Sequence, residues 1–283
     1  MYRILIDSCG ELFPEMTGDD HFVSIPLTLT VDGHDIIDDE TFDQADFLKR
    51  VAASPTSPHS ACPSPEKYIE SMRGDYDNIY IITLSSQLSG SYNSACLARD
   101  IYLEELEDDD MPPKNIHVFD SKSASIGETL IGRKIAEYEE AGLSFDEVVK
   151  ETDKYIQSQH TFFILKTLET LRKAGRLSGL KAMIANTLNI KPIMGSTPEG
   201  TIQQLGQARG MMKALDRMVD GMLSVTGDTA GRVLAISHCN ALGDVTVLKE
   251  KIEKKASFKD IVIVNTRGVS SMYANDGGII MVV

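Results

Sequence analysis

Hydroxyl-bearing residues that could hold an anion gather in one turn of the chain. Residues 84–95 read Leu-Ser-Ser-Gln-Leu-Ser-Gly-Ser-Tyr-Asn-Ser-Ala, between an apolar run at residues 79–83 and a helical pattern. In a parallel α/β sheet, ligands bind beyond the carboxyl ends of the strands. Hydroxyls and free amides at such a turn suit the oxygens of an anion, and Gly90 allows the backbone to approach a ligand closely.

Two further turns have a similar character. Residues 59–65 read His-Ser-Ala-Cys-Pro-Ser-Pro at a helix start, and residues 273–278 read Tyr-Ala-Asn-Asp-Gly-Gly before the last apolar run. Serines cap helices in most proteins, so capping alone is an alternative interpretation of each turn.

The chemistry available to these turns is binding rather than bond breaking. Serine and tyrosine hydroxyls can fix a carboxylate, but the pattern identifies no histidine or aspartate that would activate them as nucleophiles. The sequence contains no GxGxxG, GxxxxGK[ST], HExxH or GxSxG motif. Eight of the 12 methionines fall at or after Met183, and methionine fills cores or lines adaptable apolar cavities. A polar anchor beside an apolar interior suits an amphiphile with one acidic head.

Composition excludes several other classes of protein. The 283 residues carry a formal net charge of −14, which argues against a nucleic-acid partner. No apolar run is long enough for a transmembrane helix, and the acid at Asp7 interrupts any signal peptide. The four cysteines form no CxxC pair and fit no zinc site, and the acidic clusters at residues 35–46 and 104–110 are typical of solvated faces. We therefore expect a cytoplasmic protein with no metal site and no membrane segment.

Strand and helix patterns alternate through the first half. Apolar runs at residues 3–6, 79–83 and 116–119 are each followed by a turn and a helical segment, which predicts a parallel sheet of βαβ units. Thr41 with Gln44, and Ser144 with Glu147, have the spacing of capping boxes. Ser64 before a proline predicts another helix start, and further helices are expected over residues 131–141 and 145–157.

The pattern changes near residues 155–160, which predicts an N-terminal α/β domain over residues 1–157 and a C-terminal α/β domain over residues 158–283. Strands are expected at residues 160–165, 233–237, 261–264 and 279–283. Methionines recur at helical spacing over residues 208–225, which predicts an amphipathic helix. If the interior holds an apolar ligand, Met211, Met212 and Met218 of that helix are candidates to line its pocket.

Six motifs in order give the chain a resemblance to the DegV family of bacterial fatty-acid-binding proteins. The turn at residues 84–95 is similar to the family's SSxLSGTYxSA, which is the most specific match. The other five lie at residues 4–8, 25–39, 118–127, 168–178 and 188–192. The resemblance implies two α/β domains, the first with a parallel sheet, and a lipid held between and within them. It also implies a non-catalytic protein that presents the carboxyl group of a long-chain fatty acid to a separate kinase subunit for acyl phosphate formation.

The resemblance also implies which residues hold the carboxylate. Family positions correspond to Ser60, to Ser89 with Gly90 beside it, and to a histidine of a THxGPG turn for which this chain reads Tyr273. A tyrosine hydroxyl can donate a hydrogen bond but carries no positive charge at neutral pH.

Two arginines, Arg176 and Arg209, match family positions near the head group or the partner-facing surface. The alternative for each is a cation near the end of a helix.

Two other functions remain open at this stage. The protein could be a lipid-binding regulator or store that never meets a kinase, or a serine-dependent esterase or transferase that uses Ser89. None of the three hypotheses requires a cofactor beyond the bound lipid.

Overall fold

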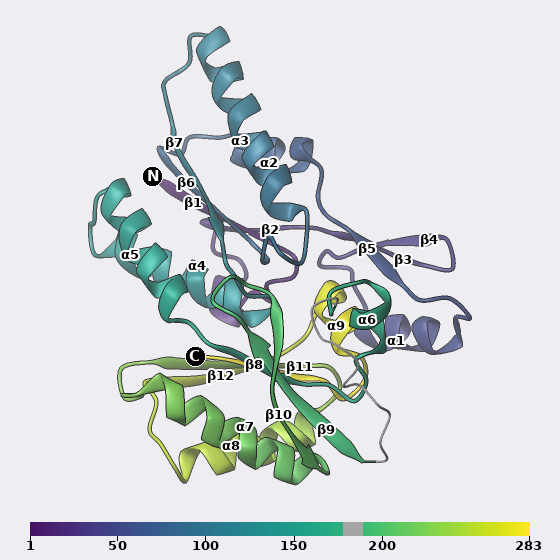
Figure 1. Ribbon diagram of the computed structural model, residues 1–283. Coiled ribbons are helices and arrows are strands. Elements are labelled where there is room, and N and C mark those ends of the chain that lie inside the picture. Colours follow the sequence, from purple (N-terminus) through teal and green to yellow (C-terminus); the bar gives the residue numbers. More distant parts are fainter. Residues whose placement is uncertain (178–188) are drawn as a thin grey trace.

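The computed structural model describes residues 1–177 and 189–283 (Figure 1). The first half contains β1 (Tyr2–Asp7), a 3-10 turn (Pro14–Met16), β2 (Phe22–Ile25), β3 (Thr28–Val31), β4 (His34–Ile37), α1 (Gln44–Ala53), β5 (His59–Ala61), α2 (Pro65–Met72), β6 (Asn78–Thr83), α3 (Ser91–Asp108), β7 (Asn115–Asp120), α4 (Ile126–Glu140) and α5 (Phe145–Ser158). The second half contains β8 (Thr161–Ile164), α6 (Glu169–Lys173), β9 (Ile190–Ser196), β10 (Ile202–Arg209), α7 (Met211–Thr226), β11 (Val233–His238), α8 (Leu242–Glu253), β12 (Asp260–Asn265), α9 (Gly268–Ala274) and β13 (Ile279–Val282).

A four-stranded parallel sheet forms the first half, in the order β2-β1-β6-β7. Helices α2 and α3 pack on one face around Leu5 and Ile81, and helices α4 and α5 pack on the other around Ile6 and Ile82. Neighbouring strand residues point to opposite faces, so a strand covered on both sides is apolar throughout. The α/β fold with a parallel sheet expected from the sequence is confirmed.

The second half builds a mixed six-stranded sheet in the order β10-β9-β8-β13-β11-β12. Its two faces pack against different parts of the protein, and the residues of β8 illustrate the difference. Phe162 and Ile164 point toward α7 and α8 and complete the largest core cluster, whereas Phe163 points to the opposite face, toward the first half of the chain. In Figure 1, α7 and α8 cover the lower face of this sheet, and the first half lies above it.

Helix α4 lies between the two large sheets. Its Ile131 and Ile135 pack on the parallel sheet, and its Ile126 and Leu130 pack with Ala235 of the six-stranded sheet. Gly132 allows the close approach, because a Cβ there would lie 2.7 Å from the Cδ1 atom of Ile6. A helix buried on both sides is apolar around most of its circumference.

A small antiparallel sheet, in the order β4-β3-β5, adjoins this junction. The parallel sheet uses residues 2–120 and the six-stranded sheet uses residues 161–282. However, α9 from the end of the chain packs with residues of the first half, where Val269 and Met272 join Leu27 and Leu29 in one cluster. The division at residues 157 and 158 stays a prediction. Within the two described ranges, no helix has the length and apolar character that crossing a bilayer requires.

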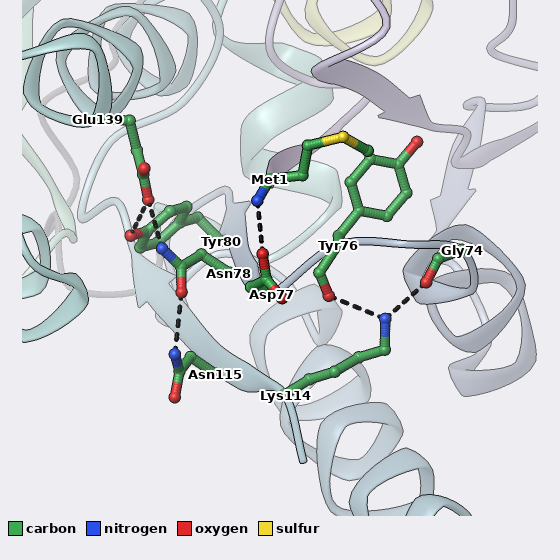
Figure 2. Close-up of polar contacts among 9 residues, drawn as sticks. All are labelled: Met1, Gly74, Tyr76, Asp77, Asn78, Tyr80, Lys114, Asn115 and Glu139. Atoms are coloured by element: carbon green, nitrogen blue, oxygen red, sulfur yellow. Dashed lines mark hydrogen bonds and ion pairs between the residues drawn. The ribbon is translucent and has the colours of Figure 1, made fainter. Parts of the chain in front are cut away.

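Polar contacts fasten the amino ends of the parallel strands (Figure 2). The amino group of Met1 donates to Asp77 at 2.5 Å. The Lys114 ammonium donates to the carbonyls of Gly74 and Tyr76 at 2.6 and 2.9 Å. These bonds lie next to the amino ends of β6 and β7, at the opposite end of the strands from the turn at residues 84–95.

Three predicted helix boundaries can be compared with the structure. The capping box of Ser144 and Glu147 and the helix start after Ser64 are confirmed. The predicted capping box at Thr41 is wrong, because the Thr41 hydroxyl donates to Asp39. The cap is Asp43, which accepts from the amide of Asp46, so the helix begins two residues later than predicted.

The methionine-rich helix also begins later than predicted. Residues 208 and 209 belong to β10, and Gly210, with a φ of +83°, separates that strand from α7. A glycine at positive φ ends the strand without the steric cost that a side chain would add.

We expect Gly200→Ala to destabilise the protein. Gly200 has a φ of +89°, and a Cβ there would lie 2.3 Å from Ser85 Oγ and 2.9 Å from Lys122 Cα. The backbone strain alone costs on the order of 1–3 kcal/mol. Gly221→Ala is the control, because Gly221 lies inside α7 with no atom within 4 Å of an added Cβ, and it should stabilise by about 0.4–1 kcal/mol. Urea denaturation measures both changes, and a Gly200→Ala protein as stable as the unaltered one would contradict this account.

Candidate functional site

The turn after β6 holds Ser89 through its own backbone and through the next serine. The amide of Ser89 donates to the carbonyl of Ser85 at 3.1 Å. The amide of Ser91, the first residue of α3, donates to Ser89 Oγ at 3.2 Å, and the two hydroxyl oxygens lie 3.0 Å apart. Ser89 is therefore fixed at a helix start, beyond the carboxyl end of a parallel strand, as predicted.

The turn that carries Ser60 meets this first turn. A Cβ on Gly90 would lie 3.3 Å from Cys62 Sγ, and the Ser94 hydroxyl donates to the carbonyl of Pro63 at 2.6 Å. Ser60 itself lies on β5, opposite Leu29 of β3. Gly90 thus allows the two hydroxyl-rich turns to pack together.

Tyr273 joins the group from the far end of the chain. Its hydroxyl lies 3.3 Å from Ser60 Oγ, and the guanidinium carbon of Arg176 lies 5.9 Å from the centre of its ring. Arg176 also donates from Nε to the carbonyl of Leu88 at 3.0 Å, one residue before Ser89. These contacts link Ser60, Tyr273, Arg176 and the Ser89 turn around one point between the two halves of the chain.

Arg209 does not belong to this group. It is exposed at the end of β10, where it pairs with Ile190 of β9, and it is absent from the described residues that line the cavity below. A partner-facing role for Arg209 stays a prediction.

An apolar cavity begins at this point and runs between the two halves of the chain. The space inside it that is open to the centres of water molecules is about 100 Å³. Thr161, Phe163 and Leu165 line it from alternate positions along β8 and after its end, and Leu84 and Leu88 face them from the first half. Tyr273, Ala274, Leu171 and Arg176 are also part of its wall, whereas Ser60, Ser89 and Gly90 adjoin this end without being among its described lining residues.

Most polar side chains in the wall are bonded to the protein. Ser123 Oγ lies 2.7 Å from Thr161 Oγ1, and Ser270 donates to the carbonyl of Cys9 at 3.0 Å. Among the described lining residues none is acidic, and the two with a full charge, Lys122 and Arg176, are cations. The chemistry of the lining therefore suits an apolar tail with an anionic head.

The methionine helix does not line this cavity, contrary to prediction. Met218 is fully buried in the core on the opposite face of the six-stranded sheet, Met211 packs at the edge of that core, and Met212 is exposed. The reason is the alternation of the strands, which directs Phe162 toward α7 and Phe163 toward the cavity. Met183 lies outside the described residues.

Buried acids lie behind the Ser89 turn, and our sequence reasoning did not select them. Asp7 accepts from the amides of Leu84 and Cys9 at 2.9 and 3.1 Å. Burial raises the pKa of Asp7 to about 6 although these hydrogen bonds oppose the change. Burial likewise raises the pKa of Glu11 to about 7.

Glu128, in the first turn of α4, is the most unusual of these acids. Burial and then the charge of Asp7 hold the pKa of Glu128 well above its usual range. The helix dipole favours a carboxylate there by about 0.3–1 kcal/mol, but burying an unpaired charge costs several kcal/mol. Burial therefore wins. The only signal in the sequence is an acid inside the apolar run Ile126 to Ile131, a pattern that also fits an exposed position on a helix.

Comparison with known proteins gives one consistent family. The DegV family model, described as an uncharacterised protein of the DegV family, matches residues 1–282. A DegV domain-containing protein of Streptococcus pneumoniae is 35% identical over 260 residues, which cover 92% of this chain and 90% of that protein.

Solved structures agree. A DegV family protein of Ruminococcus gnavus, described with vaccenic acid, is 46% identical with a TM-score of 0.95, over 100% of this chain and 99% of that one. The fatty acid kinase (Fak) B3 protein of Streptococcus pneumoniae, loaded with linoleic acid, is 33% identical with a TM-score of 0.88, over 100% of this chain and 98% of that one. With a family model that spans residues 1–282, these likenesses establish that the chain belongs to the DegV family.

Proposed function

We propose that the protein binds a long-chain fatty acid, with the tail in the cavity and the carboxylate at the end marked by Tyr273 and Arg176. The observation that carries this proposal is the cavity itself: an apolar space without an acidic residue among its described lining, in a chain whose net charge is −14. The two similar structures described with vaccenic and linoleic acid support the same ligand class.

Hydroxyl groups at this end can hold a carboxylate, and their protons can be counted. The contact between Ser60 and Tyr273 uses one of their two hydroxyl protons, so one remains for the ligand while that contact persists. Ser89 supplies a further hydroxyl. Arg176 adds a positive charge whose described hydrogen bonds go to carbonyl oxygens rather than to an acid.

We further propose that the protein presents this carboxyl group to a separate kinase subunit. In that reaction a carboxylate oxygen of the ligand bonds to the terminal phosphorus of ATP, and ADP leaves, which gives an acyl phosphate. The name of the pneumococcal relative supports such a partner. Nucleotide-binding and catalytic groups then come from the kinase, and this chain contributes binding and orientation.

Two alternatives make different demands on the site. A lipid store or regulator needs the cavity but no kinase. An esterase or transferase needs a base beside Ser89, yet in the described ranges the side-chain contact of Ser89 Oγ is with Ser91, and His238 accepts from the amide of Ala241 instead. The site geometry therefore favours binding over catalysis by Ser89.

Protein purified from a bacterial host should carry about one fatty acid per chain. Burial of each CH₂ group contributes about 0.8 kcal/mol, so a long tail gains on the order of 10 kcal/mol before the ordering costs of several kcal/mol. Native mass spectrometry with analysis of the extracted lipid measures the occupancy. The absence of lipid, together with no binding of added palmitate, would overturn the carrier hypothesis.

Ser89→Ala should weaken palmitate binding by about 10- to 150-fold, because a hydrogen bond to a charged group contributes roughly 1.5–3 kcal/mol. Ser60→Ala and Tyr273→Phe should each cost less, and their combined loss should be smaller than the sum, because they share one contact. Ser224→Ala is the control, since this exposed serine of α7 donates to the carbonyl of Gly221. Affinities measured by calorimetry decide, and unchanged binding by Ser89→Ala would remove this anchor.

With ATP and a fatty acid kinase catalytic subunit, the lipid-loaded protein should yield acyl phosphate, and neither protein alone should do so. Trapping the product with hydroxylamine and detecting the hydroxamate measures it. Retained lipid with no product across bacterial kinase subunits of this class would favour the store or regulator instead.

A further inference from the structure

Two buried acids meet behind the turn that carries Ser89. Asp7 ends β1, and Glu128 lies in the first turn of α4; both are 0% exposed. One oxygen of each and Cys9 Sγ all lie within 4.8 Å of one another. In the described part of the chain, neither oxygen of Glu128 receives a hydrogen bond from any donor.

Among the residues that the structure describes, no cation faces the pair. The ionisable groups that face it are Cys9 and Glu11, from the segment after β1, and Tyr68 from α2. None of these is a cation. Two carboxyl groups this close in a dry site hold one proton between them, because both cannot ionise. A protonated Glu128 also accounts for one of its two unpartnered oxygens, because the hydroxyl of the neutral acid donates a hydrogen bond instead of needing one.

A chain of hydroxyl groups connects the pair to the binding site. Asp7 accepts from the amide of Leu84, which opens the turn, and the nearby Ser91 hydroxyl acts on the pKa of Asp7, lowering it. Ser91 Oγ lies 3.0 Å from Ser89 Oγ. The order along this series of neighbours is Glu128, Asp7, Ser91, Ser89, of which the first three are 0% exposed.

We propose that Glu128 is neutral and donates its proton to Asp7, and that this pair directs the Ser91 and Ser89 hydroxyls toward the ligand. When Asp7 accepts hydrogen bonds from the Glu128 proton and from two backbone amides, it does not require a hydrogen bond from Ser91. The Ser91 hydroxyl then donates to Ser89, and the Ser89 hydroxyl donates to the carboxylate of the fatty acid. Without that proton, Asp7 attracts the Ser91 hydroxyl, and Ser89 turns to Ser91. Asp7 and Glu128 are then positioning residues, and this inference rests on the proposed binding of a fatty acid at Ser89.

The protonation of Glu128 can be measured in the unaltered protein by NMR with ¹³C-labelled glutamate side chains. The Glu128 carboxyl resonance, assigned by its absence in Glu128→Gln, should have the position of a protonated acid at neutral pH. Titration near the ordinary glutamate pKa of about 4.3 would overturn the inference. Elemental analysis that finds one divalent ion per chain, lost in Glu128→Gln, would overturn it as well.

The effect on the ligand is measured as palmitate affinity while the pH rises from neutral through the Glu128 pKa, which the NMR titration locates. Because the pKa of Glu128 is raised in the folded protein, its neutral form persists at neutral pH and is lost as the pH rises through that pKa. The contribution of neutral Glu128 to palmitate affinity is lost over the same range. The unaltered protein should then lose about as much affinity as Ser89→Ala does, roughly 10- to 150-fold, because Ser89 no longer donates to the carboxylate. Glu128→Gln donates the same bond without titrating, so its affinity should match that of the unaltered protein at neutral pH and then stay constant.

Two further variants complete the test. Glu128→Leu removes the donor and should bind about as weakly at neutral pH as the unaltered protein does at alkaline pH, and Glu11→Gln should keep the pH response of the unaltered protein. A Glu128→Gln protein that binds as weakly as Glu128→Leu would overturn the inference and leave fatty acid binding intact. Failure of the unaltered protein to bind any fatty acid would instead overturn the proposed function and, with it, the link from Glu128 to a ligand.

Discussion

One buried carboxylate, that of Asp38, joins parts of the chain 230 residues apart. It accepts from the amides of Gly268 and Val269 at 2.7 and 2.8 Å and from the Ser8 hydroxyl at 3.0 Å. Hydrogen bonds to a charged group contribute roughly 1.5–3 kcal/mol each. The N-terminus of α9 is therefore fixed to the first strand, and Tyr273, at the other end of that short helix, is held beside β5. Gly268 is required because a Cβ there would lie 2.5 Å from the carboxyl carbon of Asp38.

The charge inside the binding site is set by the few residues that line it and differs in sign from the net charge of the whole protein. The chain is strongly acidic, yet the described wall of the cavity carries Lys122 and Arg176 and no acid. Two nearby buried acids accept hydrogen bonds from the protein and are not part of that wall: Asp38 accepts from the amides of α9, and Glu11 accepts from Ser125. Net charge governs solubility and long-range approach, whereas a buried site responds to the few groups within a few ångströms.

Some of this structure could be predicted from the sequence, and the missing parts have physical causes. Long apolar runs predicted β1, β6 and β7, and Ser144 predicted the start of α5, because these signals are local. The capping box at Thr41 failed because Gln44 donates to the carbonyl of Thr266, a contact 222 residues away. The contact between Ser60 and Tyr273 spans 213 residues, so only family resemblance could suggest it. The lining of the cavity depends on which face each residue of β8 presents, which periodicity alone does not define.

The two faces of the six-stranded sheet differ in what covers them. Helices α7 and α8 complete one face with side chains of the same chain, whereas the other face borders a space that a separate molecule can fill. A molecule in that space becomes part of the hydrophobic core, so unfolding must release it. By mass action, a ligand at 100 times its dissociation constant adds about 2.7 kcal/mol to the free energy of unfolding. The melting temperature of such a protein then reports how much of it carries a ligand. The ligand-free protein unfolds most readily and is the form most exposed to proteolysis.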